Sequence, residues 1–317
     1  MDDTILVLPS SLPALAVPSN QVVKYGMPVG FKVSAESMDP TVLSASSLPP
    51  NSSFDPVAGR FEWTPMSSQL GAYDITFSAK SAAGVSTKTV HVDVDSGVPA
   101  ISNASQFACS PGAIATLTGK WLGPDSSAAD PSGSSTELGG SKVWVNGASV
   151  PVLLADKSNL SFLCPDGRPG EALKVVLQTS SGDMASIEST MRYVSPTLLI
   201  AEEGNAVGLV FHAGAAQLAT VRDVKGLGQP AQPGDTIAIR ATGLGKGIPV
   251  FVKVGGAYVN VLSTAPTDQP GISQLLVRVP ESSEVGDRVP VQIEVASPDG
   301  QTLRSNTVVI AIEPTRR

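Results

Sequence analysis

The fold is decided by a stretch that the chain repeats. Residues 111–123 read PGAIATLTGKWLG, and residues 233–245 read PGDTIAIRATGLG. Both stretches open with Pro-Gly and close with Leu-Gly after a run in which apolar and other residues alternate. Alternation with a period of two is typical of a half-buried β-strand, and Pro-Gly is typical of a turn. The sequence therefore predicts the same turn–strand–turn unit at two places.

The likeness continues beyond these two stretches. Two further pairs match in the same order, VWVNGA at 143–148 with VKVGGA at 252–257, and LSFLCP at 160–165 with LLVRVP at 275–280. The second pair predicts strands that stop at a proline, because proline cannot continue a central ladder. Matching segments in the same order indicate two copies of one domain.

Alternating strands and turn signals occupy the rest of the chain. In residues 89–94, Val90, Val92 and Val94 share one face of a predicted strand, while His91 and Asp93 share the other. No window predicts a helix of ten residues. We expect an all-β fold of three immunoglobulin-like β-sandwiches in an elongated tandem arrangement. The predicted parts are an N-terminal arm at 1–14, a first sandwich at 15–96, a second at 97–194, a connecting segment at 195–230 and a third sandwich at 231–317.

Composition narrows the class of protein. The chain has 317 residues, 21 Lys and Arg, 28 Asp and Glu, a net charge of −7 and 42% hydrophobic residues. This apolar content is too high for a disordered chain, and the acidic balance argues against a broad basic surface for nucleic acid. No apolar run is long enough to predict a membrane-spanning helix. The acidic start at residues 1–3 is unlike a signal peptide, so either a signal was removed or the protein is cytosolic.

Segments within residues 98–313 resemble known extracellular modules. The two copies resemble the transcription-factor-type immunoglobulin module (IPT/TIG). Residues 101–107 (ISNASQF), 121–123 (WLG), 145–147 (VNG), 231–234 (AQPG) and 242–245 (TGLG) follow in an order similar to that of the uncharacterised C-terminal modules of acidobacterial secreted proteins.

The N-terminal part resembles the bacterial putative-Ig and cadherin-like modules. The resemblance rests on residues 48–56 (LPPNSSFDP), 59–65 (GRFEWTP), 71–77 (GAYDITF) and 82–84 (AAG). Together these resemblances imply an extracellular or cell-surface location, a string of all-β modules, and a role in surface architecture or adhesion. None of these families implies a catalytic centre.

The inventory of reactive side chains favours a protein that is not an enzyme. The two histidines are His91, on the outer face of a predicted strand, and His212, which has no partner at metal-ligand spacing. No Gly-x-Ser-x-Gly motif supports a serine nucleophile. We expect no catalytic residues and no cofactor.

Two cysteines and two carboxylates are candidates for structural roles. Cys109 and Cys164 fall within one predicted module, and they form either a disulfide, which we favour, or two buried thiols. Asp93 and Asp95, at the first domain boundary, are weak candidates for calcium ligands. Calcium requires six to eight oxygen ligands, so a solvated linker remains the simpler interpretation and no metal is expected.

Two tryptophans in the second sandwich are candidates for ligand contact. Trp144 points outward because Val143 and Val145 take the inward phase, and Trp121 takes the loop position that Gly243 has in the other copy. Exposed tryptophans form flat apolar platforms for sugar rings or for a partner protein. The alternative is that the long loop at residues 124–140 covers both rings. Trp63 is expected to be a packing residue.

The N-terminal arm contains a candidate assembly strand, Thr4, Ile5, Leu6, Val7 and Leu8, limited by Pro9. It either packs on its own domain or adds a strand to the sheet edge of a neighbouring copy, giving a homo-oligomer or fibre.

These observations favour a non-enzymatic extracellular structural or adhesive protein that acts through surface contacts with protein or glycan. The alternative is a carbohydrate-binding accessory region of a larger secreted enzyme. Neither hypothesis includes a nucleic acid partner or a membrane span.

Overall fold

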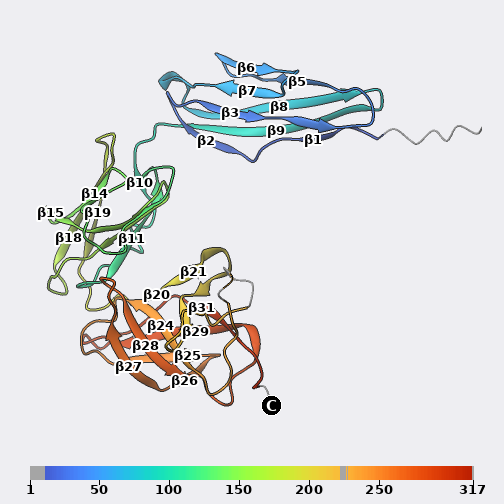
Figure 1. Cartoon of the computed structure of the whole chain (residues 1–317). Coiled ribbons are helices and arrows are strands. Elements are labelled where there is room, and N and C mark those ends of the chain that lie inside the picture. The colour runs from blue at the N-terminus through green and yellow to red at the C-terminus, as the bar shows by residue number, and fades with distance from the viewer. Residues whose placement is uncertain (1–10, 222–225, 227, 316–317) are drawn as a thin grey trace, which may run out of the picture. The chain divides into compact units, whose positions relative to one another are not determined.

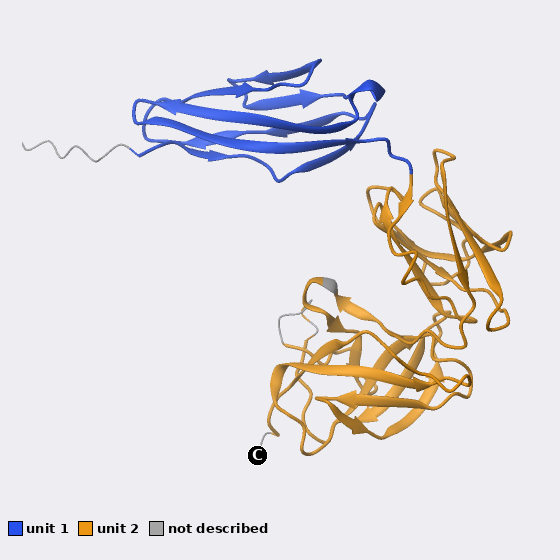
Figure 2. Ribbon diagram, turned by 180° about the vertical axis from the view of Figure 1, so that it is seen from behind, with its two compact units in different colours: residues 1–98 blue, residues 99–317 orange. Residues whose placement is uncertain are grey.

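The computed structural model describes residues 11–221, 226 and 228–315. The chain forms two compact units, Met1–Val98 and Pro99–Arg317 (Figure 2). The regular structure of the described residues is β-strand, apart from two 3-10 helices at Ser67–Gln69 and Glu203–Asn205. The predicted all-β fold of immunoglobulin-like sandwiches is confirmed. None of the described residues lies in a helix that is long and apolar enough to cross a membrane.

The first unit is one sandwich with faces β2-β9-β8-β5 and β3-β7-β6, and with the short pair β1-β4 (Figure 1). Its strands are β1 (Ala14–Ala16), β2 (Gln21–Lys24), β3 (Val29–Lys32), β4 (Ser34–Glu36), β5 (Val42–Ser46), β6 (Ser52–Asp55), β7 (Arg60–Trp63), β8 (Gly71–Ser81) and β9 (Gly84–Asp95).

Aromatic side chains fill the core of the first unit. Phe61 stacks on Phe31 with ring centroids 4.8 Å apart, and Phe61 also meets Phe77 edge to face. Trp63 is buried and contacts Tyr73 edge to face at 4.9 Å, so its expected packing role is confirmed. These buried rings supply the large apolar area that holds the two faces together.

The alternation predicted for residues 89–94 is also present in this unit. Val90, Val92 and Val94 on β9 are buried, while His91 lies on the outer face, where its Nδ1 is 2.8 Å from Asp74 Oδ1. A period-two pattern was therefore sufficient to orient this strand.

The second sandwich pairs β10-β11-β17-β16-β12 in one sheet and β13-β14-β18-β19 in the other, with β15 on β14. Its strands are β10 (Ala100–Ile101), β11 (Ile114–Lys120), β12 (Ala128–Ala129), β13 (Glu137–Leu138), β14 (Ser141–Val145), β15 (Ala148–Val150), β16 (Val152–Ala155), β17 (Asn159–Leu163), β18 (Ala172–Gln178) and β19 (Met184–Thr190).

The third sandwich pairs β20-β24-β28-β27, with β23 on β24, against β21-β22-β31-β29-β25-β26, with β30 on β29. Its strands are β20 (Thr197–Leu198), β21 (Ile200–Glu202), β22 (Val207–Gly208), β23 (Val210–His212), β24 (Thr236–Thr242), β25 (Val250–Val254), β26 (Ala257–Val259), β27 (Val261–Pro266), β28 (Ser273–Arg278), β29 (Gly286–Ala296), β30 (Thr302–Arg304) and β31 (Val308–Ile312).

The repeat found in the sequence extends to the pairing register. In the second sandwich Leu117 lies opposite Leu160, and in the third sandwich the corresponding residues Ile239 and Leu275 are paired. The strands β14 and β18 share their register with β25 and β29 in the same way. Each copy has its own buried cluster of apolar side chains, so each closes around a separate core.

Residues 195–230, which the sequence analysis treats as a connecting segment, supply strands to the third sandwich. The strands β20 and β23 pair with β24, and β22 pairs with β31. The register of β20 matches that of β10, since Ala100 pairs with Lys120 and Thr197 with Thr242. The first strand of the third copy is therefore β20, which precedes the segment quoted for the repeat.

Candidate binding surfaces

The outer face of the third sandwich holds a buried carboxylate. Glu294 lies on β29 between Ile293 and Val295, whose side chains are in the core, so the glutamate side chain points away from the core. Glu294 is nevertheless only 4% exposed. A carboxylate covered to this extent needs several hydrogen-bond donors, because burying an unpaired charge is strongly unfavourable.

Three side chains from three strands provide these donors. Lys253 Nζ on β25 and Arg304 Nε on β30 both lie 2.9 Å from Glu294 Oε1. The Tyr258 hydroxyl on β26 donates to Glu294 Oε2. Lys253 Nζ also lies 4.5 Å from the centroid of the Tyr258 ring, a cation–π contact. Both oxygens of the carboxylate are therefore engaged.

This network fixes one of two exposed aromatic rings that meet on the surface. Tyr258 is 62% exposed, and Phe251, which is 48% exposed, lies opposite Glu294 on β25. The two rings meet nearly at right angles with centroids 6.5 Å apart. We call Phe251, Lys253, Tyr258, Glu294 and Arg304 the Glu294 surface. Aromatic side chains and arginine are the residues that most often anchor a protein partner at an interface.

The hydrogen bond from Tyr258, followed by that from Lys253, lowers the pKa of Glu294 to about 2. The same ion pair raises the pKa of Lys253. Because the folded-state pKa of Glu294 is lower than its ordinary value, its contribution to stability is complete above pH 4.5 and is lost as the pH falls towards 2.

We expect Glu294→Gln to lower the melting temperature of the third sandwich by several degrees at pH 7, because a neutral amide cannot pair with Lys253 and Arg304. The difference from the wild type should shrink between about pH 5 and pH 2. Calorimetry over this pH range measures it. A difference that stays constant with pH would show that the charge of Glu294 contributes nothing.

The two predicted contact tryptophans lie on different elements of the second sandwich. Trp144 lies on β14 between the buried residues Val143 and Val145, in the outward phase that was expected, and it is half-buried. Trp121 is also half-buried, and Lys157 Nζ lies 3.9 Å from the centroid of its ring. Within the described residues no ring contact joins the two tryptophans, and whether they contact a ligand stays a prediction.

Trp121 has an unusual backbone conformation. Its φ is 59°, in the left-handed region, and φ at the corresponding Gly243 is 70°. A bulky residue in this region is rare and costs on the order of 1 kcal/mol. Its indole Nε1 is buried and has no hydrogen-bond partner among the described residues. The second copy therefore keeps a tryptophan where the third copy has the less strained glycine.

A carboxylate within the long loop at residues 124–140 orders the chain around it. Asp130 accepts hydrogen bonds from the backbone nitrogens of Ser132, Ser134 and Ser135, at 3.0, 3.1 and 2.9 Å. Hydrogen bonds from Ser132 and then from the Ser135 backbone lower the pKa of Asp130. The loop is therefore a structured turn at this point.

Cys109 and Cys164 are joined by a disulfide, and their Cα atoms are 5.8 Å apart. Both residues are buried in the core of the second sandwich. The bond connects the segment before β11 with the end of β17.

The remaining candidates have local structural contacts. Asp95 accepts a hydrogen bond from the Gly97 nitrogen at 2.9 Å, and Asp93 lies within β9 opposite Ala72. Among the described residues no group of three or more His, Cys, Asp or Glu side chains is placed to hold a metal ion. His212 Nε2 lies 2.9 Å from the Gln229 carbonyl oxygen. The assembly strand predicted at residues 4–8 lies outside the described residues.

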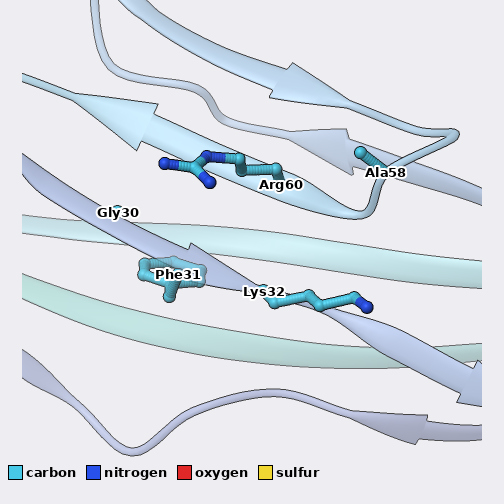
Figure 3. Close-up of a pocket in the computed structure, with 5 residues that line it drawn as sticks. All are labelled: Gly30, Phe31, Lys32, Ala58 and Arg60. Carbon is cyan, nitrogen blue, oxygen red and sulfur yellow. The ribbon is translucent and has the colours of Figure 1, made fainter.

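A shallow hollow on the first unit is lined by Gly30, Phe31, Lys32, Ala58 and Arg60 (Figure 3). Lys32 and Arg60 are opposite each other on β3 and β7, but their cationic groups extend in opposite directions (Figure 3). Arg60 Nε pairs with Glu62 Oε1 at 2.6 Å on the exposed face. This ion pair compensates one of the two charges, so the hollow is a weak candidate for an anion site.

The Glu294 surface is the site that the sequence analysis missed. Lys253 lies in the repeated segment at residues 252–257, but Lys253, Tyr258 and Arg304 were not singled out as site residues. The sequence offered little signal, since Glu294 takes the outward phase of the alternating stretch VPVQIEV at residues 289–295, where a charged side chain is normally exposed.

The chain is a tandem of immunoglobulin-like β-sandwiches, and the family comparison agrees for its first unit. The family described as "Putative Ig domain" (He_PIG) matches residues 11–95. No curated protein matches the chain.

Solved structures give distant similarities. The glucan-utilisation protein SGBP-B of Bacteroides ovatus, in complex with a mixed-linkage heptasaccharide, is 12% identical, with coverage of 96% of this chain and 71% of that one and a TM-score of 0.29. The titin I9–I11 tandem is 11% identical, with coverages of 96% and 98% and a TM-score of 0.25. A candidate α-galactosidase/melibiase of Bacteroides fragilis is 19% identical over 29% of this chain, with a TM-score of 0.24, and the match spans only 20% of that protein.

Proposed function

We propose that this chain is a non-enzymatic extracellular structural or adhesive protein whose immunoglobulin-like sandwiches act through surface contacts. The Glu294 surface is the observation that carries the proposal. Its two exposed aromatic rings stand on a sheet face, and the Tyr258 ring is fixed by the hydrogen bond to a buried carboxylate. Fixing a ring before binding reduces the entropy lost on association.

The chemistry of the Glu294 surface suits contact with another protein. Tyrosine, phenylalanine and arginine are enriched at protein interfaces, and Arg304 remains largely exposed while it contacts Glu294. The tandem fold and the likeness of residues 11–95 to an Ig family are compatible with an extracellular location.

Adhesion can be measured with beads coated with the full chain. We expect coated beads to aggregate, and the double variant Phe251→Ala/Tyr258→Ala to reduce aggregation at least about tenfold, because two anchoring rings are lost. The matched control is Val57→Ala, which removes an exposed apolar side chain from the first unit. Aggregation that is absent in the wild type, or unchanged in the double variant, would contradict the proposal.

Assembly through the arm is part of the same proposal. Its described portion packs on its own domain, since Ala14 pairs with Glu36 of β4 and Ser86 Oγ donates to the Pro13 carbonyl oxygen at 2.6 Å. A truncation that tests Thr4–Leu8 must therefore stop at residue 10. Light scattering and negative-stain microscopy then compare the intact and truncated chains, and oligomers only from the intact chain would support strand addition.

The second candidate is a carbohydrate-binding accessory region that uses Trp121 and Trp144. The strained backbone of Trp121 favours this candidate, because strained backbone conformations are concentrated at binding sites. Trp121→Gly introduces the glycine that the third copy has at the corresponding position. Glycine suits this backbone conformation, so a loss of glycan binding in this variant would be due to the missing indole ring. Trp144→Ala tests the other ring.

A further inference from the structure

A hollow of about 530 Å³ lies within the unit Pro99–Arg317, where the end of the second sandwich meets the turn between β29 and β30. Two hydrogen bonds hold the sandwiches together at this junction. Ser110 Oγ lies 2.8 Å from Ser195 Oγ in a buried contact, and the Ile114 nitrogen donates to Thr242 Oγ1 at 2.8 Å. Both copies of the repeat line the hollow, since its residues come from 169–193 in the second sandwich and from 297–303 in the third.

The side chains lining the hollow combine an aromatic ring with polar groups of both kinds. Tyr193 is 42% exposed and lies beside Arg192, and Asp299 and Gln301 line the same hollow from the β29–β30 turn. Among the described residues, no hydrogen bond or ion pair engages the guanidinium of Arg192, the hydroxyl of Tyr193 or the side-chain amide of Gln301. These groups are available to a ligand as donors and acceptors.

A polar pair adds a second observation. Ser297 and Asp299 both line the hollow, and Ser297 is only 6% exposed. A hydrogen bond from the Ser297 side chain is the largest cause that lowers the pKa of Asp299. Ser297 therefore favours the ionised form of this carboxyl, which accepts hydrogen bonds.

We infer that this hollow binds an oligosaccharide segment, with the Tyr193 ring against one sugar face and Arg192, Asp299 and Gln301 around the ring hydroxyls. Sugars present a C–H face to an aromatic ring and hydroxyls at their edge, and each hydroxyl both donates and accepts. The guanidinium donates, the carboxylate accepts, and the amide does both. A peptide would use a larger apolar area than this mixed lining offers.

The test is affinity electrophoresis of the full chain in gels that contain β-glucan, xylan, galactomannan or pectin. We expect at least one polysaccharide to retard the wild type. Tyr193→Ala should raise the apparent Kd at least about tenfold through the lost stacking, and Asp299→Asn/Gln301→Ala should raise it similarly. The matched control is Tyr25→Ala, which removes an exposed tyrosine from the first unit and should leave binding unchanged. Unchanged melting temperatures would show that the variants are folded.

Two results in the gels would overturn the inference. Either no polysaccharide retards the wild type, or retardation persists in Tyr193→Ala, whether or not Trp144→Ala abolishes it. Peptides selected by display whose binding depends on Tyr193, without polysaccharide binding, would also overturn it by assigning the hollow to a protein. The inference goes beyond the proposed adhesive function and rests on different residues, so bead aggregation and gel retardation can fail independently.

Discussion

Replacing Cys109 with Ala and Cys164 with Val is expected to lower the free energy of unfolding of the second sandwich by roughly 4 kcal/mol. The estimate follows from the chain-entropy model for cysteines 55 residues apart in sequence. The bond removes conformations from the unfolded chain, which regains them when the bond is absent. For a domain of this size the loss corresponds to a fall in melting temperature on the order of 15–30 °C.

These replacements separate the effect of losing the covalent bond from the effect of losing side-chain packing. Val279 occupies the position of Cys164 in the third sandwich and is buried there, so valine is compatible with this strand position. Alanine at position 109 leaves only a small gap. The third sandwich, which closes around its own core without a cysteine, is an internal reference.

Hydrogen exchange distinguishes the two sandwiches in the intact chain. Amides of β14 and β17 should exchange much faster in the double variant, while those of β25 and β28 should be unchanged. Reduction of the wild type should reproduce the effect. Protection of β17 that changes by less than about tenfold, which corresponds to about 1.4 kcal/mol, would contradict the prediction.

The sequence predicted those elements whose pattern is local. The Pro-Gly and Leu-Gly boundaries of residues 111–123 and 233–245 enclose β11 and β24, and even the register with β17 and β28 is shared. Alternation over a full strand determines its register, because a shift of one residue would turn the apolar side chains from the buried face to the exposed face. Trp63 was likewise assigned correctly to the core from its motif.

The pairing of the strands at the start of the third sandwich could not be predicted in this way. The strands β20 and β22 have two residues each, too few for a period to be visible. They become strands because β24 and β31 offer unpaired edges, which is a tertiary effect. The Glu294 surface was missed for a related reason, since Lys253, Tyr258, Glu294 and Arg304 meet only through the order of the strands.

Gly243→Ala is expected to destabilise the third sandwich by about 3 kcal/mol or more. Gly243 has a φ of 70°, which L-residues rarely adopt, and a Cβ here would lie 2.1 Å from the Ser195 carbonyl oxygen. The oxygen belongs to the backbone, so it cannot move away as a flexible side chain could. The expected cost combines left-handed strain with displacement of the chain that enters β20.

The displacement should reach the junction between the two copies. The Ser195 nitrogen donates to the Gly243 carbonyl oxygen at 2.8 Å, and Ser195 Oγ pairs with Ser110. Moving Ser195 therefore weakens a backbone hydrogen bond and a buried side-chain contact together. Since the Ser110 contact joins the two sandwiches, the lining of the adjoining hollow should also change.

Gly247→Ala is a closely matched control. Gly247 is in the same sandwich with a φ of 68°, but a Cβ there would have no atom within 4 Å. The control carries the left-handed strain without the clash and should cost only about 1 kcal/mol. Denaturant unfolding of both variants gives the difference, about 2 kcal/mol or more, that is due to contact with Ser195. Equal costs for the two variants would show that the close approach of Ser195 contributes nothing, and that the glycine at 243 is required for its backbone conformation alone.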